Sequence, residues 1–306
     1  MTLFNWLLLA FLSFLWGGSF FFNEIALTGF PIFTVVFGRV FIAAILLILI
    51  LYWKKVSIPW SWPLVLSFLA MGLINNVIPF SLIVAGQTEI TSSLTSVLNA
   101  TTPLFAALVA HFATTEASER LNLKRIVGIG LGIIGVAILL GPKIGEIGFS
   151  GNEVLGQLAI LGSSFSYGIA VVFGRRFGRM GISPLATAAG QVTASSLWLF
   201  PIILIVDRPW TYLVSSGWEA ISAIICIAVF STALAYILYF RLIQTAGSTN
   251  ASLVTLLIPV TAMLLGFLFL DETITSTMLI GLCAIASGLL VIDGRVFKFL
   301  KRKSPA

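Results

Sequence analysis

Ten apolar runs follow one another along this chain, separated by short polar connections. A helix needs about 20 apolar residues to cross the hydrocarbon of a bilayer. The predicted spans lie at 4–22, 31–53, 62–85, 90–111, 122–140, 153–174, 184–206, 217–240, 248–270 and 274–293. Because the connections leave no room for a separate soluble domain, the runs predict an all-α membrane protein whose neighbouring helices pack side by side.

The composition excludes a water-soluble domain. Of the 306 residues, 59% are hydrophobic and only 9% are charged. A soluble domain has a polar outside and cannot hide that much apolar surface. The formal net charge of +6 raises the alternative of a nucleic-acid partner. However, the positive residues lie in connections and not on a basic helix, so no nucleic acid is expected to bind.

Lysine and arginine are divided very unevenly between the two sets of connections. One set, together with the C-terminal tail, carries all but a few of the 17 positive residues. The other set carries only Lys143 and Arg208. Positive residues gather on the cytoplasmic side of membrane proteins. The chain is therefore expected to have both termini in the cytoplasm, which an even number of spans requires.

The second half of the chain is a weak sequence repeat of the first half. Pro103 and Glu116 recur as Pro259 and Glu272 at a constant spacing of 156 residues. Each copy holds five spans, and an odd number places the two copies upside down relative to each other. The sequence thus predicts two inverted five-helix repeats around a central cavity. The predicted units are a first repeat at 1–145, a second at 146–295 and a basic cytoplasmic tail at 296–306.

Arg39 is a strongly charged residue placed inside a predicted span. It lies eight residues past Pro31, or roughly 12 Å along a helix. Charged residues within spans are costly and often functional, so Arg39 is a candidate cavity cation that meets a substrate carboxylate or another anionic group. The alternative is a structural arginine that ties helices together or extends toward the membrane surface. The sequence leaves both interpretations open.

Three spans combine an asparagine with a proline three, four or nine residues later. A proline inside a helix frees a backbone carbonyl, and a polar neighbour indicates a kink that faces protein or water. We expect the asparagines to line the cavity and the prolines to act as hinges or gates. The alternative is helix–helix hydrogen bonding, which contributes about 0.6 kcal/mol on average. The pairs are Asn76 with Pro79, Asn99 with Pro103 and Asn250 with Pro259.

Five further residues are candidates for the cavity wall. Trp16 and Ser19 lie in the first span, and Tyr167 stands at a related place in the sixth. Gln191 lies in the seventh span and Tyr236 in the eighth. The aromatic residues are the stronger candidates for contact with cargo. Small hydroxyl residues such as Ser19 often serve only to let helices pack closely.

The sequence offers little for catalysis or metal binding. His111 is the single histidine, and Cys226 and Cys283 both fall inside apolar runs. None of these belongs to a zinc-ligand spacing, and we find no nucleophile elbow or phosphate-binding loop. We therefore expect no enzyme activity, no metal and no cofactor.

Three glutamates lie near predicted span ends: Glu24, Glu89 and Glu272. Carboxylates at such places can pass protons during transport. Solvated charges at the membrane edge are the preferred interpretation. Proton coupling therefore stays open at the level of the sequence.

Several of these features together resemble a known family. They are Trp16-Gly17-Gly18-Ser19, Arg39, Pro103, Pro259, the turn Leu270-Asp271-Glu272-Thr273-Ile274 and the glycines Gly281 and Gly288. Over residues 4–293 the chain resembles the EamA-type branch of the drug/metabolite transporter superfamily. The resemblance implies ten helices in two inverted repeats around a central cavity, and the export of amino acids and related metabolites from bacterial cells.

The chain departs from that family at two places. Thr115-Glu116-Ala117 lacks the glycine expected before the glutamate, so the turn in the first half is expected to be shaped differently. Relatives that move sugar phosphates use paired basic residues in the cavity. Arg39 stands alone, which argues against a highly anionic cargo.

The sequence therefore predicts a secondary transporter in the cytoplasmic (inner) membrane of a prokaryote. Its expected cargo is a small neutral or zwitterionic metabolite such as an amino acid, exported by alternating access. The alternative is a flippase for lipids or other amphiphiles. The expected partners are a small-molecule substrate and the lipid bilayer, and both a monomer and a homodimer remain open.

Overall fold

The computed structural model describes residues 1–113, 122–141, 151–212 and 216–293. Within these ranges every regular element is helical and no β-strand occurs. Several predicted features lie outside the described residues. They are the turn around Glu116, the charge of Lys143, the repeat boundary at 145/146 and the basic tail at 296–306.

Eight helical spans are long and apolar enough to cross a membrane, judged by length and composition. They are Leu3–Leu27, Ile32–Trp53, Trp62–Gln87, Ser92–Ala113, Leu123–Leu140, Asn152–Arg179, Pro184–Asp207 and Trp218–Ala246. Two further apolar helical stretches are shorter, Val254–Phe269 and Ser276–Ile292. Each of the ten predicted runs therefore overlaps helix in the described residues.

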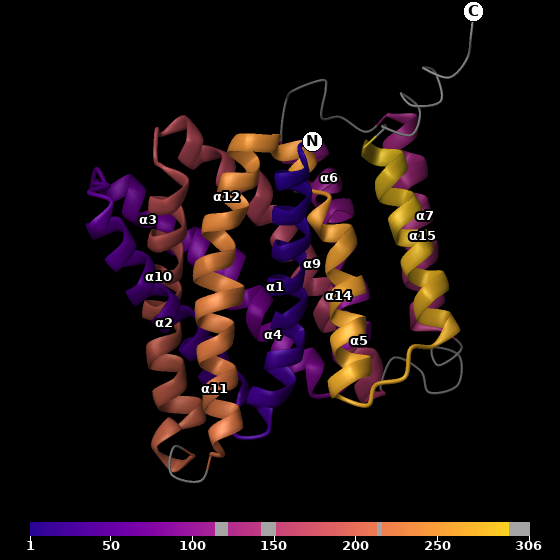
Figure 1. Ribbon diagram of the computed structural model, residues 1–306, viewed down its shortest axis with the longest axis horizontal. Helices are drawn as coiled ribbons and strands as arrows, with labels where there is room; N and C mark the ends of the chain where they lie inside the picture. The colour runs from indigo at the N-terminus through magenta and orange to yellow at the C-terminus, as the bar shows by residue number, and fades with distance from the viewer. Residues whose placement is uncertain (114–121, 142–150, 213–215, 294–306) are drawn as a thin grey trace, which may run out of the picture.

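Four spans are single α-helices, and the others are built from shorter pieces (Figure 1). The single helices are α1 (Leu3–Leu27), α2 (Ile32–Trp53), α7 (Leu123–Leu140) and α9 (Asn152–Arg179). The third span consists of α3 (Trp62–Gly72), η1 (Leu73–Val77) and α4 (Ile78–Gln87), and the fourth of α5 (Ser92–Asn99) and α6 (Thr102–Ala113). The seventh span consists of α10 (Pro184–Ile202) and η4 (Ile203–Asp207), and the eighth of α11 (Trp218–Cys226), η6 (Ile227–Leu234) and α12 (Ala235–Ala246). The short helices η5 (Pro209–Thr211) and α13 (Ser248–Ala251) precede α11 and α14 (Val254–Phe269), and α15 (Ser276–Asp293) ends the described chain.

The elements η1, η4 and η6 are π-helical stretches inside spans. A π-helical turn widens the helix and often marks a functional position. Asn75 and Asn76 lie in η1, and Pro79 follows in the first turn of α4. Regular α-helical bonding is therefore interrupted at the asparagine–proline stretch, as the sequence predicts.

The other two prolines occupy different places in their spans. Asn99 ends α5, a turn follows, and Pro103 is the second residue of α6. Pro259 instead lies inside the continuous helix α14, and the break in this span comes earlier, between Ala251 and Val254. The hinge role of these prolines stays a prediction.

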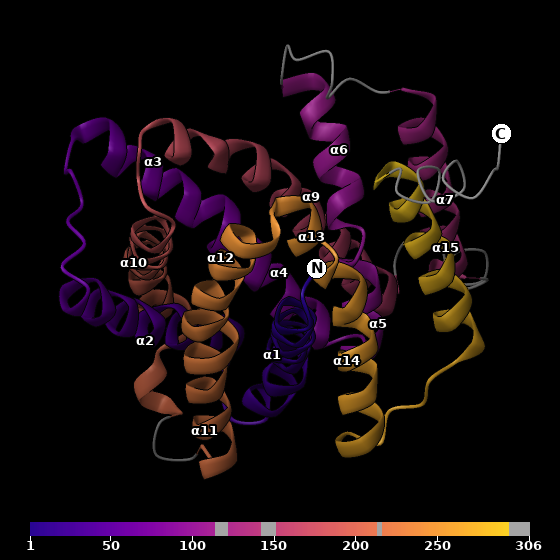
Figure 2. The same cartoon turned by 45° about the horizontal axis from the view of Figure 1, so that its top comes forward.

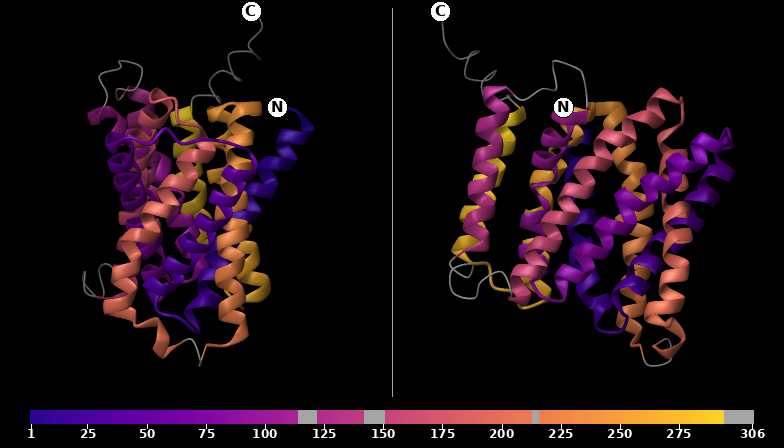
Figure 3. Two further views of the ribbon diagram at one scale, coloured as in Figure 1. Left: turned by 90° about the vertical axis from the view of Figure 1, so that its left-hand side faces the viewer. Right: turned by 180° about the vertical axis from the view of Figure 1, so that it is seen from behind.

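Helices α7 and α15 form a pair at one edge of the bundle (Figures 1 and 3). They pack almost entirely against each other. A Cβ atom at Gly128 would lie 2.6 Å from the carbonyl oxygen of Gly288, and one at Gly135 would lie 2.9 Å from that of Gly281. Glycine is needed at these positions because the two backbones touch.

Buried apolar residues form two clusters in the rest of the bundle. One is centred on α2, α3, α10 and α11, and the other on α1, α5 and α14. Helix α1 lies between α12 and α14 (Figure 2). Tyr167 of α9 packs against both clusters, so it marks the seam between them.

Candidate functional site

Arg39 lies inside the bundle and does not reach the membrane surface. Only 6% of the side chain is exposed. Its Nε atom donates a hydrogen bond of 2.9 Å to Oγ1 of Thr232 in η6. The centre of its guanidinium group lies 3.7 Å from the ring centroid of Phe80 in α4, which is a cation–π contact. This burial excludes the snorkelling arrangement that the sequence left open.

Arg39 has no acidic counter-ion in the described part of the chain. The acidic side chains described there lie at helix ends and connections, away from the middle of α2. The described contacts of its guanidinium are the hydroxyl of Thr232 and the ring of Phe80. A buried positive charge therefore faces only neutral hydroxyl and aromatic groups.

A hydrogen-bonded cluster of neutral polar residues joins the two halves of the chain. Asn75 Nδ2 donates to Gln191 Oε1 at 3.1 Å, and Asn76 Nδ2 donates to Ser195 Oγ at 2.9 Å. The hydroxyl of Tyr236 donates to Asn76 Oδ1 at 3.2 Å. Each bond runs from η1 to α10 or α12, so the cluster lies across the boundary between the halves.

Local structure explains why these groups meet. Both asparagines lie in the π-helical stretch η1, and Gly72 precedes it. A Cβ atom at Gly72 would lie 2.8 Å from the carbonyl oxygen of Gln191 and 2.9 Å from the amide nitrogen of Ser195. The missing side chain allows this span to approach α10 closely, which brings the amides within hydrogen-bonding distance.

Half-buried aromatic rings lie near this cluster. The rings of Trp16 and Tyr239 are 5.2 Å apart, between α1 and α12. Tyr167 meets Phe80 edge to face with a centroid separation of 6.4 Å. Because Phe80 also contacts Arg39, Tyr167 joins the same group of residues.

The remaining candidates are placed less centrally. Asn99 accepts a hydrogen bond of 3.4 Å from Ser164, which lies one turn before Tyr167 on α9. Ser19 is buried in α1. Asn250 donates to the carbonyl oxygen of Ala246 in the connection after α12. Ala246 ends α12 about 15 Å along the helix from Tyr236, so Asn250 lies at that end of the span and apart from the cluster.

Sequence reasoning does not find every contact in this group. The face under Arg39 belongs to Phe80, one of 25 phenylalanines, and no pattern distinguishes it from the others. Ser195 lies one helical turn after Gln191, so the helical period places it beside that candidate. This period is the signal that points to Ser195.

Two carboxylates of the second half cap helices of the first half. Asp207 Oδ2 accepts hydrogen bonds from Thr34 in the first turn of α2. Glu272 accepts from the backbone amides of Ser92 and Ser93 at 2.8 and 3.0 Å, at the start of α5, and from the Ser93 hydroxyl. Negative groups stabilise a helix N-terminus. Glu272 is thus a half-buried cap at the end of a span, whereas Glu89 is exposed.

Glu24 lies beside this second cap. Gln87 Nε2 contacts its Oε2 atom at 3.4 Å, and Gln87 also receives a hydrogen bond of 2.9 Å from Asn23. An open pocket of about 370 Å³ is lined in part by Glu24, Gln87, Glu89 and Glu272. The described residues contain no group of three or more histidine, cysteine or acidic side chains that would hold a metal ion.

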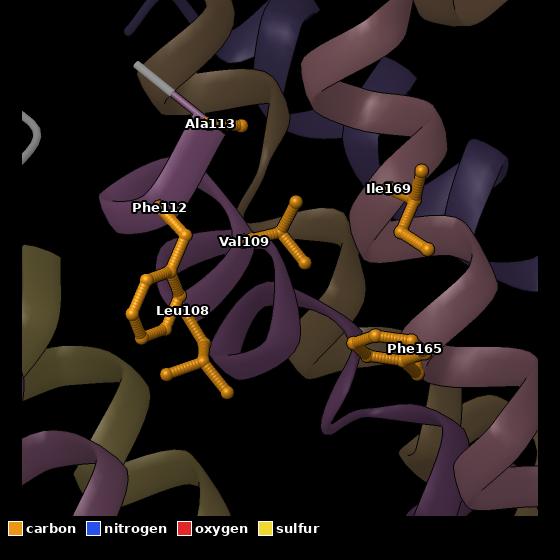
Figure 4. Close-up of a pocket in the computed structure, with 6 residues that line it drawn as sticks. All are labelled: Leu108, Val109, Phe112, Ala113, Phe165 and Ile169. Atoms are coloured by element: carbon orange, nitrogen blue, oxygen red, sulfur yellow. The ribbon is translucent and has the colours of Figure 1, made fainter. Parts of the chain in front are cut away.

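A second pocket, on the outer surface of the bundle, is apolar. It has a volume of about 440 Å³ and lies between α6 and α9. Figure 4 shows its six lining residues, which are Leu108, Val109, Phe112, Ala113, Phe165 and Ile169. None of these side chains carries a polar group, so the pocket suits a hydrocarbon chain.

Comparisons with known proteins agree on one family. Residues 4–141 and 154–293 match the EamA-like transporter family. Uncharacterized transporter YoaV of Bacillus subtilis (strain 168) is 25% identical over 268 residues, which cover 87% of each protein. A protein of Salmonella typhimurium named probable amino-acid metabolite efflux pump is 27% identical over 196 residues, covering 61% of this chain and 62% of that protein.

A solved crystal structure shares the fold. The two chains superpose with a TM-score of 0.65 at 18% sequence identity, covering 93% of this chain and 95% of the other. The matched family and the named relatives are transporters and not enzymes. Together with the apolar helices, these matches identify a multi-pass membrane protein that acts on a small-molecule substrate. The chain therefore belongs to the EamA-like transporter family.

Proposed function

We propose that the protein exports small neutral or zwitterionic metabolites, amino acids among them, by alternating access. The observation that carries this proposal is the polar cluster of Asn76, Gln191 and Tyr236 inside the bundle. Arg39, which is buried in α2, makes a separate bond to Thr232 of the second half. Polar groups within spans are costly and mark substrate routes. The cluster draws residues from both halves, as expected for a site at the interface of two repeats that move against each other.

The glycines of α7 and α15 support inverted repeats of five spans each, at 1–145 and 146–295. Under the repeat, Gly128 corresponds to Gly281 and Gly135 to Gly288. In the packed pair, Gly128 meets Gly288 while Gly135 meets Gly281. This crosswise pairing is the pattern that a two-fold axis between equivalent helices produces. An axis of this kind in the membrane plane relates inverted repeats, and ten spans follow from it.

The charge distribution supports a location in the cytoplasmic (inner) membrane of a prokaryote with both termini in the cytoplasm. The N-terminus and the end of α15 lie at the same end of the bundle (Figure 1). The described positive residues at this end include Lys54, Arg179 and Arg241. Arg208 lies at the opposite end, after η4. Positive residues are enriched in cytoplasmic connections.

The aromatic residues support an amphiphilic cargo. Trp16, Tyr239 and Tyr167 present large half-buried rings beside hydrogen-bonding amides. Such a mixture of apolar surface and few polar groups is typical of small-molecule sites. The printed name of the Salmonella relative points in the same direction.

Counterflow in proteoliposomes tests the function. The purified protein, reconstituted in lipid vesicles, is loaded with each of the 20 common amino acids, and uptake of the labelled form is measured with and without a pH gradient. We expect saturable counterflow of at least one amino acid by the wild type. Asn76→Ala should reduce it at least tenfold, whereas the exposed control Thr88→Ala should not. Absence of saturable flux for the whole panel would sink the proposal, and the pH-gradient arm separates proton-coupled from facilitated transport.

One observation favours the alternative of a flippase for lipids. The apolar groove between α6 and α9 suits an acyl chain (Figure 4). However, its lining offers no hydrogen-bonding side chain to a lipid headgroup, and a headgroup needs a polar path across the membrane. Scrambling of a labelled phospholipid between leaflets, together with no amino-acid counterflow, would select the flippase.

A further inference from the structure

We propose that Arg39 is the receptor for a carboxylate of the cargo, and that the site takes molecules with a single negative group. This inference rests on the proposed transport of small metabolites. The inference goes beyond that function because it names the chemical group that the site recognises and the residue that binds this group.

The first step concerns charge. A buried guanidinium stays positive because its pKa is too high for deprotonation in proteins. Buried charges are retained when they are paired, since desolvation is otherwise not compensated. In the described residues Arg39 is 6% exposed and no carboxylate bonds to it. The missing counter-ion is therefore supplied from outside the described chain, and a carboxylate group of the cargo provides it.

The second step concerns geometry. A guanidinium carries five N–H donors in a planar fork. Nε of Arg39 is occupied by Thr232, and Phe80 covers one face of the group. These two contacts fix the plane of the guanidinium but leave the terminal nitrogens without a described acceptor. Terminal nitrogens held in one plane bind both oxygens of a carboxylate at once.

The third step limits the class of anion. The other described positive residues lie at helix ends, so a single cation faces the site. The polar contact of Arg39 within the described residues is the neutral hydroxyl of Thr232, and the cluster of Asn75, Gln191 and Tyr236 is neutral as well. A phosphate ester or a dicarboxylate would bring two negative charges to one positive charge. A monocarboxylate matches the charge, and neutral amide oxygens and phenols can accept from an ammonium group of the same molecule.

Carboxylates and their uncharged amides provide the direct test. Each amino acid transported in counterflow is compared with its own carboxamide, which has the same side chain and amine but no carboxylate. We expect the wild type to transport the acid at least tenfold more efficiently than the amide, judged by kcat/KM. Arg39→Gln should lower kcat/KM for the acid at least tenfold and leave that for the amide within twofold. Equal losses for acid and amide in a folded variant would overturn the assignment.

Two milder variants keep the proposal testable if Arg39→Gln fails to fold. Arg39→Lys keeps the charge but loses the planar fork, and Thr232→Val removes the partner of Nε. Both should raise KM for the acid at least threefold without changing KM for the amide. If both variants match the wild type, Arg39 only ties helices together.

The matched control is Arg179→Gln, which removes one positive charge from the exposed end of α9. It should transport acid and amide like the wild type.

Failure of the proposed function and failure of the role of Arg39 give different results. No transport of any amino acid sinks the proposed function, whereas transport that ignores the carboxylate sinks only the role of Arg39.

Discussion

Asp207 holds the start of α2 through Thr34, whose backbone nitrogen and hydroxyl lie 2.6 and 2.9 Å from the same carboxylate oxygen. The two residues come from opposite halves of the chain and both are buried. A side chain that is 173 positions away in sequence thus does what a neighbouring N-cap residue usually does.

Loss of this cap should weaken the fold. Asp207→Ala should lower the free energy of unfolding by about 1–2 kcal/mol, because the amide and hydroxyl of Thr34 lose a charged acceptor. Thermal unfolding in detergent measures the change. Glu89→Ala removes an exposed carboxylate from the same end of the bundle and should leave the midpoint nearly unchanged. Equal midpoints for both variants would contradict the capping role.

The cap on α5 makes a local prediction. Glu272→Ala should accelerate hydrogen exchange at the amides of Ser92 and Ser93, since both donate to this carboxylate. Glu272→Gln keeps an acceptor oxygen and should give an intermediate rate. Mass spectrometry of peptides covering the start of α5 measures the exchange. Unchanged protection in the alanine variant would show that water replaces the carboxylate without cost.

The contact between α7 and α15 can be tested with one methyl group. A Cβ atom at Gly288 would collide with the backbone of Gly128, whereas one at Gly130 meets nothing within 4 Å. Gly288→Ala should therefore destabilise the protein by about 1–3 kcal/mol. Gly130→Ala should be neutral or stabilising by up to about 1 kcal/mol, through helix propensity alone. Thermal unfolding of the two variants provides the measurement, and Gly288→Ala should have the lower midpoint. A lower midpoint for Gly130→Ala would contradict the close contact between α7 and α15.

The Tyr236 hydroxyl gives a prediction for the polar cluster. Tyr236→Phe removes the shorter of the two hydrogen bonds to Asn76 Oδ1 and leaves only the contact of 3.4 Å from Asn75 Nδ2, which should cost about 1–3 kcal/mol in a buried site. Transport should weaken as well, because the same hydroxyl belongs to the cluster that joins the two halves. Tyr52→Phe is the matched control, since that side chain is 81% exposed. Counterflow and thermal unfolding of the two variants provide the measurements, and wild-type behaviour of Tyr236→Phe would remove the phenol from the site.

Hydropathy predicts the helices well because crossing hydrocarbon leaves the backbone little choice. The runs at 31–53 and 122–140 become α2 and α7 with boundaries within one residue. The run at 217–240 falls short, since its helical span extends to Ala246. There the polar residues Arg241, Gln244 and Thr245 continue the helix past the apolar stretch, and hydropathy does not register them.

The candidate site is predicted less completely. The asparagine–proline stretch identifies Asn76 because an amide beside a proline is conspicuous in an apolar run. Its partners depend on which faces of distant helices meet, and periodicity along one helix does not encode that. Asn250 illustrates the limit: the sequence predicts it to line the same cavity, yet it lies in α13, after the end of α12, where it donates to the carbonyl oxygen of Ala246. The same limit hides the caps, since Asp207 and Glu272 act on helices far away in sequence.

The two caps also give the bundle a direction. Asp207 and Glu272 both belong to the second half, and both cap first-half helices. Both lie at the end of the bundle opposite the N-terminus and the end of α15 (Figure 1). Any motion that parts the halves at that end must release both carboxylates to water. At about 1–2 kcal/mol for each cap, the combined cost is about 2–4 kcal/mol, a population ratio of roughly 30 to 900. The placement of the two carboxylates thus makes separation of the halves cost more free energy at this end of the bundle than it would without the caps.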